Sequence, residues 1–163
     1  MKRLRIILCC LILSGFTFGI LPAQNAAVIK IDFDRKISVI DPNIYSAFVE
    51  PIRTVVYGSI YDPASAFSDE NGFRKDFISL VKNLKIRTLR WPGGNFVASY
   101  NWMDGIGPKD KRPAKIDLAW NQIEKNQMGT DEYAKFTNLI GAESFVCVNG
   151  GTGTIQDATN WIE

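Results

Sequence analysis

Histidine is absent from the sequence, which is 163 residues long. Its absence excludes the Ser-His-Asp and Cys-His catalytic arrangements and every metal site with imidazole ligands. Cysteine is scarce, and two of the three cysteines lie side by side in an apolar N-terminal run. Once that run is removed, only Cys147 remains, so no internal disulfide can form. We interpret Cys147, in the apolar stretch "SFVCVN", as a buried structural thiol, and we assign no metal site.

An excess of charge of one sign is also lacking. The formal net charge is only +2, which does not indicate nucleic acid or an anionic surface as a partner. No Walker sequence is present, and "GGTGT" at 150–154 lacks the third glycine of a dinucleotide fingerprint because Gln156 stands there. We therefore expect no cofactor. With 46% hydrophobic and 22% charged residues, the chain has the composition of a globular protein.

Residues 1–26 have the features of a secretory signal peptide. Three of the first five residues are Lys or Arg, residues 6–20 are mostly apolar, and small residues between Ala23 and Ala27 form a cleavage region. A membrane anchor is the alternative, but the apolar run is short for a spanning helix, which needs about 20 residues. A lipoprotein fits less well, because Leu8 and not a small residue precedes Cys9. We predict a secreted or periplasmic protein with no membrane association after cleavage.

The rest of the chain alternates strands with helices. Ile29, Ile31 and Phe33 in "AAVIKIDFD" share one face and predict a half-buried strand. Beyond it, the patterns predict strands over 44–50, 86–91 and 144–149, and helices over 73–84, 131–140 and 154–163. This alternation predicts an α/β fold with parallel strands. Three strand–helix units are too few to close a (β/α)8 barrel, so they suggest the first part of a longer protein.

The segment 92–129 is predicted to be long and irregular. Loops of this length inside a compact domain usually have a function, and this one carries Trp102 and Trp120. A linker would be poorer in aromatic residues, so we interpret the segment as a structured binding loop. After it, Thr130 is a plausible N-cap for the next helix, and Gly141 is suited to end that helix.

Polar side chains follow each of the three predicted parallel strands. Glu50 ends the first, Arg90 to Asn95 end the second in "RWPGGNF", and Asn149 ends the third. Barrels and doubly wound sheets place their sites at these carboxyl ends. A carboxylate, a guanidinium, amides and tryptophan faces together suit a polyhydroxylated ring, which needs both donors and acceptors. Ordinary roles remain open, because Arg90 could pair with Glu50 and Asn149 could cap the next turn.

Four longer stretches carry a family resemblance. They are "DPNIYSAFVE", "LRWPGGNFVASYNWMDGIGPKDKRP", "IDLAWNQIEKNQMGTDEY" and "GAESFVCVNGGTGTIQDATNWIE". In this order they resemble the N-terminal part of the family 51 glycoside hydrolases, which are chiefly α-L-arabinofuranosidases. The resemblance runs from about residue 28 to the last residue. The tract from Arg90 to Pro113 is its most specific part.

The resemblance implies a (β/α)8 catalytic barrel joined to a β-sandwich. Residues 1–26 would be the signal peptide, residues 27–40 a strand region associated with the sandwich, and residues 41–163 a partial barrel of about three strand–helix units. Enzymes of this family retain anomeric configuration with two glutamates. The acid/base follows barrel strand 4 and the nucleophile follows strand 7. Neither has a counterpart in this sequence, so we assign no catalytic residue here.

The resemblance also assigns sugar-binding roles to positions in this sequence. Glu50 matches the strand-1 glutamate that binds the arabinose ring, and Asn95 matches a sugar-binding asparagine. Arg90 matches an arginine at the base of the same pocket, and Trp120 matches a tryptophan at its mouth. Asn149 matches only a position at the end of strand 3. The family usually has His after the strand-1 glutamate, whereas "PI" follows here, so this loop departs from the family pattern.

The sequence therefore predicts a retaining α-L-arabinofuranosidase that releases terminal arabinofuranosyl units from plant polysaccharides or oligosaccharides. We expect the 163-residue chain alone to be inactive. The alternatives are a related barrel glycosidase, such as an endoglucanase or xylosidase, and a non-catalytic carbohydrate-binding remnant. The expected partner is an arabinose-containing poly- or oligosaccharide, not nucleic acid. The full-length enzyme could be a homo-oligomer.

Overall fold

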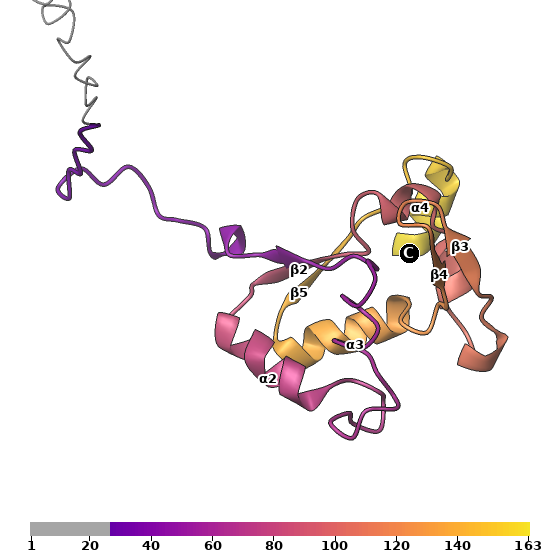
Figure 1. Ribbon diagram of the computed structural model, residues 1–163. Coiled ribbons are helices and arrows are strands. Elements are labelled where there is room, and N and C mark those ends of the chain that lie inside the picture. The colour runs from indigo at the N-terminus through magenta and orange to yellow at the C-terminus, as the bar shows by residue number, and fades with distance from the viewer. Residues whose placement is uncertain (1–26) are drawn as a thin grey trace, which may run out of the picture. The chain divides into compact units, whose positions relative to one another are not determined.

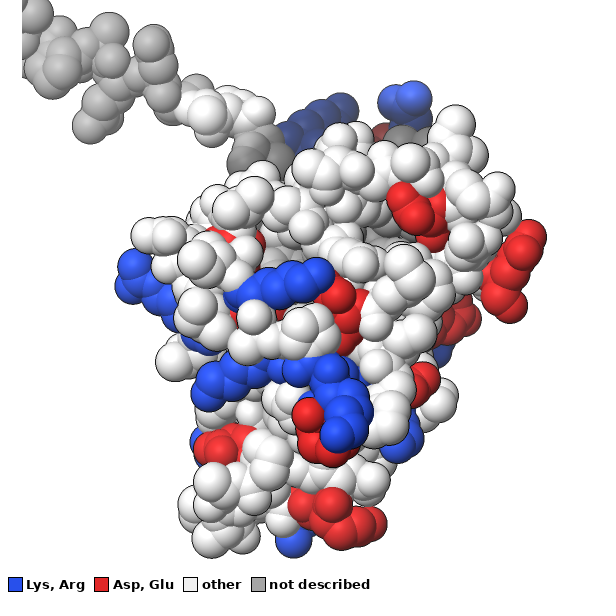
Figure 2. Space-filling view, turned by 90° about the vertical axis from the view of Figure 1, so that its right-hand side faces the viewer, with Lys and Arg blue, Asp and Glu red and all other residues white. Residues whose placement is uncertain are grey.

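The computed structural model describes residues 27–163, and the chain divides into two units after Ser38. The signal peptide predicted for residues 1–26 lies outside the described residues. Within the described part, the longest apolar helices fall short of what a membrane span requires. In the space-filling view of one face, acidic side chains lie next to basic ones (Figure 2), as a chain with nearly balanced charge allows.

The first unit does not contain the strand predicted for residues 28–33. The described residues 27–38 contain one turn at Phe33 and Asp34 and no strand. At that turn the Asp32 carboxylate accepts a hydrogen bond from Asp34 N–H at 3.2 Å. The apolar face is exposed, with Ile29 and Phe33 each 84% accessible. A strand requires a hydrogen-bonded neighbour, and the described part of this unit supplies none.

The second unit is built on a three-stranded parallel sheet, so the α/β prediction is confirmed. The strands are β1 (Ala47–Phe48), β2 (Thr88–Trp91) and β5 (Glu143–Val146), in the order β1-β2-β5. β1 is shorter than the predicted strand over 44–50, because Pro42–Ile44 form a 3-10 helix that Asp41 caps. Val49 N–H still donates to the Arg90 carbonyl at 2.8 Å, which extends the pairing towards Glu50.

Two helices cover one face of this sheet. α2 (Lys75–Leu84) and α3 (Thr130–Ile140) lie together on that side (Figure 1). Trp91, which is buried, stacks on Tyr133 with the ring centroids 5.0 Å apart, and the Tyr133 hydroxyl donates to the Leu89 carbonyl. Phe48, Arg90 and Phe145 are paired in register across the strands, and both phenylalanines are more than half exposed. The other face of the sheet is therefore open.

The helices follow the predicted pattern with local differences. The helix predicted over 73–84 has an apolar face of Phe73, Phe77, Leu80, Val81 and Leu84 in the sequence pattern; this face is wrong in part, because Leu80 and Leu84 are exposed and Ile78 is the buried residue of α2. Gly129, not Thr130, is the N-cap of α3. Gly141 ends α3 in the left-handed conformation, with φ 75°, as predicted. α4 (Ile155–Ile162) begins with reciprocal hydrogen bonds between Thr154 and Asp157, and Cys147 is only half-buried.

The segment 92–129 is more regular than predicted. It contains 3-10 helices at 96–99, 102–105 and 109–111. It also contains an antiparallel hairpin, β3 (Lys115–Asp117) and β4 (Gln122–Glu124), in which Ile116 pairs with Ile123. Three-residue strands are too short to show a clear alternation of apolar and polar residues, which is why the sequence pattern did not reveal the hairpin.

Candidate functional site

The Glu50 carboxylate is held at the carboxyl end of β1. The side chain is 7% exposed. Its Oε1 atom accepts two hydrogen bonds, one from Phe96 N–H at 2.8 Å and one from the Trp120 indole Nε1–H at 3.1 Å. Its Oε2 atom has no hydrogen bond to any described residue. One carboxylate oxygen is thus fixed by the protein, while the other can accept a hydrogen bond from a ligand.

The glycines in "RWPGGNF" allow the chain to pass directly over Glu50. Gly93 has φ +106°, and a Cβ atom placed there would lie 2.3 Å from the Cγ atom of Glu50. A Cβ atom placed on Gly94 would meet no other atom within 4 Å, so the two neighbouring glycines have different roles. The peptide bond between Trp91 and Pro92 is cis. This loop brings Phe96 N–H back to Glu50.

The β3–β4 hairpin positions Trp120 at this site. Asp117 is buried, and its two carboxylate oxygens accept from Ala119 N–H at 2.9 Å and Trp120 N–H at 3.1 Å. These bonds define the turn from which the Trp120 indole reaches Glu50. Trp120 is still 37% exposed, so part of its ring remains available for contact with a ligand.

A second contact connects the hairpin to the loop after Glu50. The Gln122 side chain accepts from Arg53 N–H at 2.7 Å and donates to the Pro51 carbonyl at 2.6 Å. The hairpin therefore holds both Glu50 and the residues that follow it. Sequence analysis did not identify Gln122 or Asp117, because their partners lie far away in the chain and only the tertiary fold brings them together.

Arg90 and Asn95 lie at the same end of the sheet as Glu50. Arg90 is partly exposed, and its guanidinium lies 5.2 Å from the centroid of the Phe48 ring. Among the described residues, no ion pair joins Arg90 to Glu50, so the alternative of an internal pair is not observed. Asn95 is exposed, and its side chain makes no hydrogen bond to a described residue. Both polar groups are therefore available to a ligand.

Asn149 is used within the protein. Its Nδ2 atom donates to the Tyr100 carbonyl and to Thr152 Oγ1, both at 3.0 Å. Its Oδ1 atom accepts from Gly151 N–H at 3.0 Å and Thr152 N–H at 2.9 Å. This is the turn-capping arrangement that was the alternative for Asn149. Trp102 likewise packs inside the protein, stacked on Trp161 with 6.1 Å between the ring centroids.

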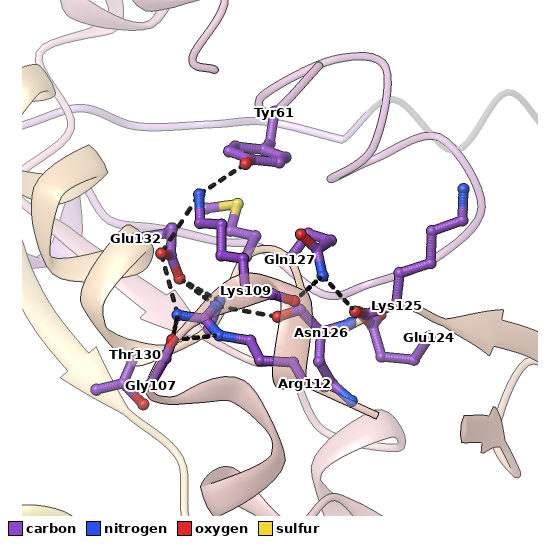
Figure 3. A network of polar contacts seen from close by, with 12 residues as sticks. Tyr61, Gly107, Lys109, Arg112, Glu124, Lys125, Asn126, Gln127, Thr130 and Glu132 are labelled. Atoms are coloured by element: carbon purple, nitrogen blue, oxygen red, sulfur yellow. Dashed lines mark hydrogen bonds and ion pairs between the residues drawn. The ribbon is translucent and has the colours of Figure 1, made fainter. Parts of the chain in front are cut away.

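A buried ion pair anchors the segment that carries the hairpin to helix α3. Arg112 Nη1 lies 2.7 Å from Glu132 Oε2, and the two side chains are 2% and 6% exposed. Arg112 also donates to the carbonyls of Gly107 and Asn126 (Figure 3). Gly129 N–H donates to Glu132 at 2.9 Å. Burial by itself would raise the pKa of Glu132, but the hydrogen bonds from Arg112 and Gly129 outweigh it and lower that pKa.

The fold and the site together define a class of protein. A parallel α/β sheet with a fixed carboxylate at the carboxyl ends of its strands is the arrangement in which barrels and doubly wound sheets bind ligands. The family model described as the α-L-arabinofuranosidase 1 domain matches residues 80–162. The chain therefore belongs to the α-L-arabinofuranosidase family of glycoside hydrolases.

Named relatives and solved structures agree with this assignment. The chain is 50% identical over 147 residues to α-L-arabinofuranosidase C of Emericella nidulans, which covers 90% of this chain and 29% of the relative. It is 49% identical over 140 residues to the intracellular exo-α-(1→5)-L-arabinofuranosidase of Acetivibrio thermocellus, with 86% and 28% covered. The chain thus spans less than a third of the length of these relatives.

The structural comparison gives the same family. The thermostable α-L-arabinofuranosidase of Thermotoga petrophila, of glycoside hydrolase family 51, matches with a TM-score of 0.73 and 52% identity. The match covers 74% of this chain and 25% of that one. The family 51 arabinofuranosidase of Xanthomonas axonopodis matches with a TM-score of 0.75 at 29% identity, over 79% and 27% of the two chains.

Proposed function

We propose that this chain is the N-terminal part of a retaining α-L-arabinofuranosidase that releases terminal arabinofuranosyl units from plant polysaccharides or oligosaccharides. The observation that carries the proposal is the state of Glu50. One of its oxygens is fixed by Trp120 and Phe96, while the other has no described partner. A buried acceptor in this state suits a sugar hydroxyl, which must donate a hydrogen bond when it leaves water.

The neighbouring side chains fit the same ligand. The exposed part of Trp120 offers an apolar aromatic surface to the C–H groups of a furanose ring. The guanidinium of Arg90 can donate to ring hydroxyls, and the amide of Asn95 can both donate and accept. Asn149 does not take part in this proposal, because its amide already makes four hydrogen bonds in the protein.

The reaction would be a double displacement. One carboxylate attacks the anomeric carbon while a second protonates the leaving oxygen, and water then releases the sugar from the enzyme. The two carboxyl groups of such sites lie about 5–5.5 Å apart. We assign neither to this chain, because Glu50 matches the family's sugar-binding glutamate and the family's two catalytic glutamates follow barrel strands 4 and 7. The role of the chain would be to hold the sugar ring while groups elsewhere in the enzyme react with it.

We further propose that β1, β2 and β5 are the first three strands of a (β/α)8 barrel. Their parallel order and their single helix-covered face support this arrangement. The open face with Phe48, Arg90 and Phe145 would then point into the barrel. In the same proposal, residues 41–163 belong to the barrel and residues 27–40 add a strand to a β-sandwich.

Export is a separate proposal. The basic start, apolar run and small-residue boundary of residues 1–26 support secretion or transport to the periplasm. One relative is named as intracellular, so location need not follow the family. N-terminal sequencing of protein recovered outside the cytoplasm should give a first residue between Ala23 and Ala27. A protein that still begins at Met1 would contradict cleavage.

The activity is tested on the complete natural protein that contains this chain. We expect hydrolysis of an aryl α-L-arabinofuranoside, with much slower turnover of an aryl β-xyloside or a β-glucan. Glu50→Gln should lower kcat/KM for the arabinofuranoside by roughly 10²–10³-fold, the effect of losing one charged transition-state contact. Glu70→Gln, at an exposed residue of the 51–72 segment, is the matched control and should leave kcat/KM unchanged.

Two results would contradict parts of this proposal. Faster turnover of the xyloside than of the arabinofuranoside would favour the related glycosidase. Normal kcat/KM in Glu50→Gln would return Glu50 to a structural role in holding Phe96 and Trp120.

A further inference from the structure

A small cavity lies between the β3–β4 hairpin and the segment 96–104, and Glu50 does not line it. Its volume is about 50 Å³. Its lining includes the polar and charged residues Tyr100, Asp104, Lys115, Asp117, Glu124 and Asn126. A polar cavity needs only about 10–15 Å³ of such volume to hold one small occupant. This cavity is therefore large enough for an ion or for more than one water molecule.

Three buried oxygen atoms of residues that line this cavity have no hydrogen-bond partner among the described residues. They are Glu124 Oε2, Asn126 Oδ1 and Tyr100 Oη. Glu124 is 5% exposed, Asn126 2% and Tyr100 8%. Buried polar atoms in native proteins almost always have a partner, in the protein or in a bound species. When Glu124 is ionised, Glu124 Oε2 and Asn126 Oδ1 can accept hydrogen bonds but cannot donate them. Each therefore requires a hydrogen-bond donor or a cation.

The remaining atoms of these side chains fix their orientation. Glu124 Oε1 accepts from the Tyr57 hydroxyl and from Asn126 N–H at 2.7 Å. Asn126 Nδ2 donates to the Pro113 carbonyl at 2.7 Å. Exchanging the oxygen and nitrogen of the Asn126 amide would lose this bond. The amide oxygen of Asn126 is therefore held in place as an acceptor at the cavity.

The charge around the cavity is negative. Asp104, Asp117 and Glu124 contribute carboxylates, and Lys115 is the one basic residue that lines the cavity, where it pairs with Asp104. Within the described residues, no basic group lies within ion-pair distance of Glu124 or Asp117. Burial, followed by the charges of Glu124 and Asp104, raises the pKa of the Tyr100 hydroxyl. Two buried carboxylates therefore lack a compensating positive charge.

We propose that this cavity is a binding site for a monovalent cation of the size of Na⁺ or K⁺. Carboxylate, amide and hydroxyl oxygens are the ligands that hard cations prefer. A water molecule could donate to both acceptors but would leave the charge uncompensated. Burial raises the pKa of Glu124, so a proton on this carboxyl group is the competing means of neutralising it, but a proton would not occupy the cavity. The bound cation would hold the hairpin, and with it Trp120, against the segment 96–104.

Thermal unfolding of the complete natural protein tests the proposal with the salts alone. We expect Tm to be about 2–4 °C higher in NaCl or KCl than in choline chloride of equal ionic strength, because the cation binds only the folded state. Glu124→Gln should abolish this difference, and Tyr100→Phe, which removes only one oxygen, should reduce it. Glu70→Gln is the exposed control and should keep the full difference.

A crystal grown or soaked in RbCl locates the ion directly. An anomalous peak within about 3 Å of Glu124 Oε2 and Asn126 Oδ1 is expected. Ordered water at that position without an anomalous signal, together with equal Tm in all three salts, would overturn the proposal. Unfolding stability that rises on acidification and does not respond to the cation would also overturn it, since the occupant would then be a proton on Glu124.

Discussion

Glu50 and Gly93 form a close pair in which each residue depends on the other. The backbone at Gly93 passes over the Glu50 side chain so closely that a Cβ atom would lie within 2.5 Å of three of its carbons. The carboxylate is in turn fixed through Oε1 alone. The geometry of the site therefore depends on a residue that has no side chain, and substituting it should displace Glu50.

Gly93→Ala and Gly94→Ala form a matched pair that tests this dependence. Gly93→Ala should destabilise the protein by about 1–3 kcal/mol, because it introduces a side chain at a positive φ and against Glu50. It should also lower kcat/KM on the arabinofuranoside. Gly94→Ala has open space and should change both quantities little. Urea unfolding and steady-state kinetics measure them, and equal effects of the two variants would contradict the contact.

The Arg112–Glu132 pair is a second feature at the residue scale. Both side chains are almost fully buried, so removing Arg112 leaves the Glu132 carboxylate with only the longer ion pair to Lys109 Nζ, at 3.5 Å. We expect Arg112→Met to lower the free energy of unfolding by about 3–5 kcal/mol. Lys111→Met, at the exposed neighbouring residue, should change it by less than about 1 kcal/mol. A small effect of Arg112→Met would mean that the pair is not formed.

The same pair predicts an acid-side loss of stability. The pKa of Glu132 is lowered in the folded protein from its ordinary value of 4.5, so the unfolded chain binds a proton more readily. The contribution is complete above pH 4.5 and is lost as the pH falls through the folded pKa. Urea unfolding between about pH 6 and pH 3 should show this loss in the wild type. The loss should be smaller in Arg112→Met, and identical slopes would contradict it.

At the scale of elements, the β3–β4 hairpin is bound to the end of β1 and to the loop that follows it. Asp117 shapes its turn, Trp120 reaches Glu50, and Gln122 holds Pro51 and Arg53. The buried Arg112–Glu132 pair fixes the preceding segment on α3. The hairpin is therefore held at the proposed sugar site by Trp120 and Gln122, and the segment before it is held on α3.

Gln122→Ala should weaken the attachment of the β3–β4 hairpin to the loop after Glu50. The loss of two hydrogen bonds should cost about 1–3 kcal/mol of stability. Because Trp120 and Glu50 would be less well positioned, KM for the arabinofuranoside should rise more than kcat falls. Lys125→Ala, at an exposed residue just beyond β4, is the control. If KM and kcat are unchanged in Gln122→Ala, the contact with Pro51 and Arg53 does not position the site.

At the scale of the whole molecule, the sheet has an open face. Phe48 and Phe145 are exposed on it beside Arg90, and apolar surface of this kind is normally covered by further structure. The match to less than a third of each relative's length agrees with the proposal that other segments cover this face in the complete enzyme.

The 163-residue chain by itself should therefore be inactive and prone to aggregate. Its proposed site offers Glu50 alone, whereas the double displacement needs two placed carboxylates. We expect no turnover of an aryl α-L-arabinofuranoside by the purified chain, and light scattering should show association. The complete natural protein from the same host should be active. Turnover by the short chain that Glu50→Gln abolishes would make Glu50 a catalytic residue and contradict this prediction.

The sequence alone determined the α/β class, the parallel direction of the strands, the approximate helix positions and the family. These follow from local periodicity, from turn residues such as Gly141, and from the specific tract between Arg90 and Pro113. Local patterns also placed Glu50, Arg90 and Asn95 at one end of the sheet, because parallel strands bring their carboxyl ends together.

Only the tertiary structure decided the contacts between distant segments. The bonds from Trp120 to Glu50 and from Gln122 to the Pro51 loop join residues about 70 positions apart in the chain. Only the structure shows that the amide of Asn149 is hydrogen-bonded within a turn and that the described residues 27–38 contain no strand. The physical reason is the same in each case. A polar group forms hydrogen bonds with the groups that the fold brings close to it. The local sequence does not show which distant groups these will be.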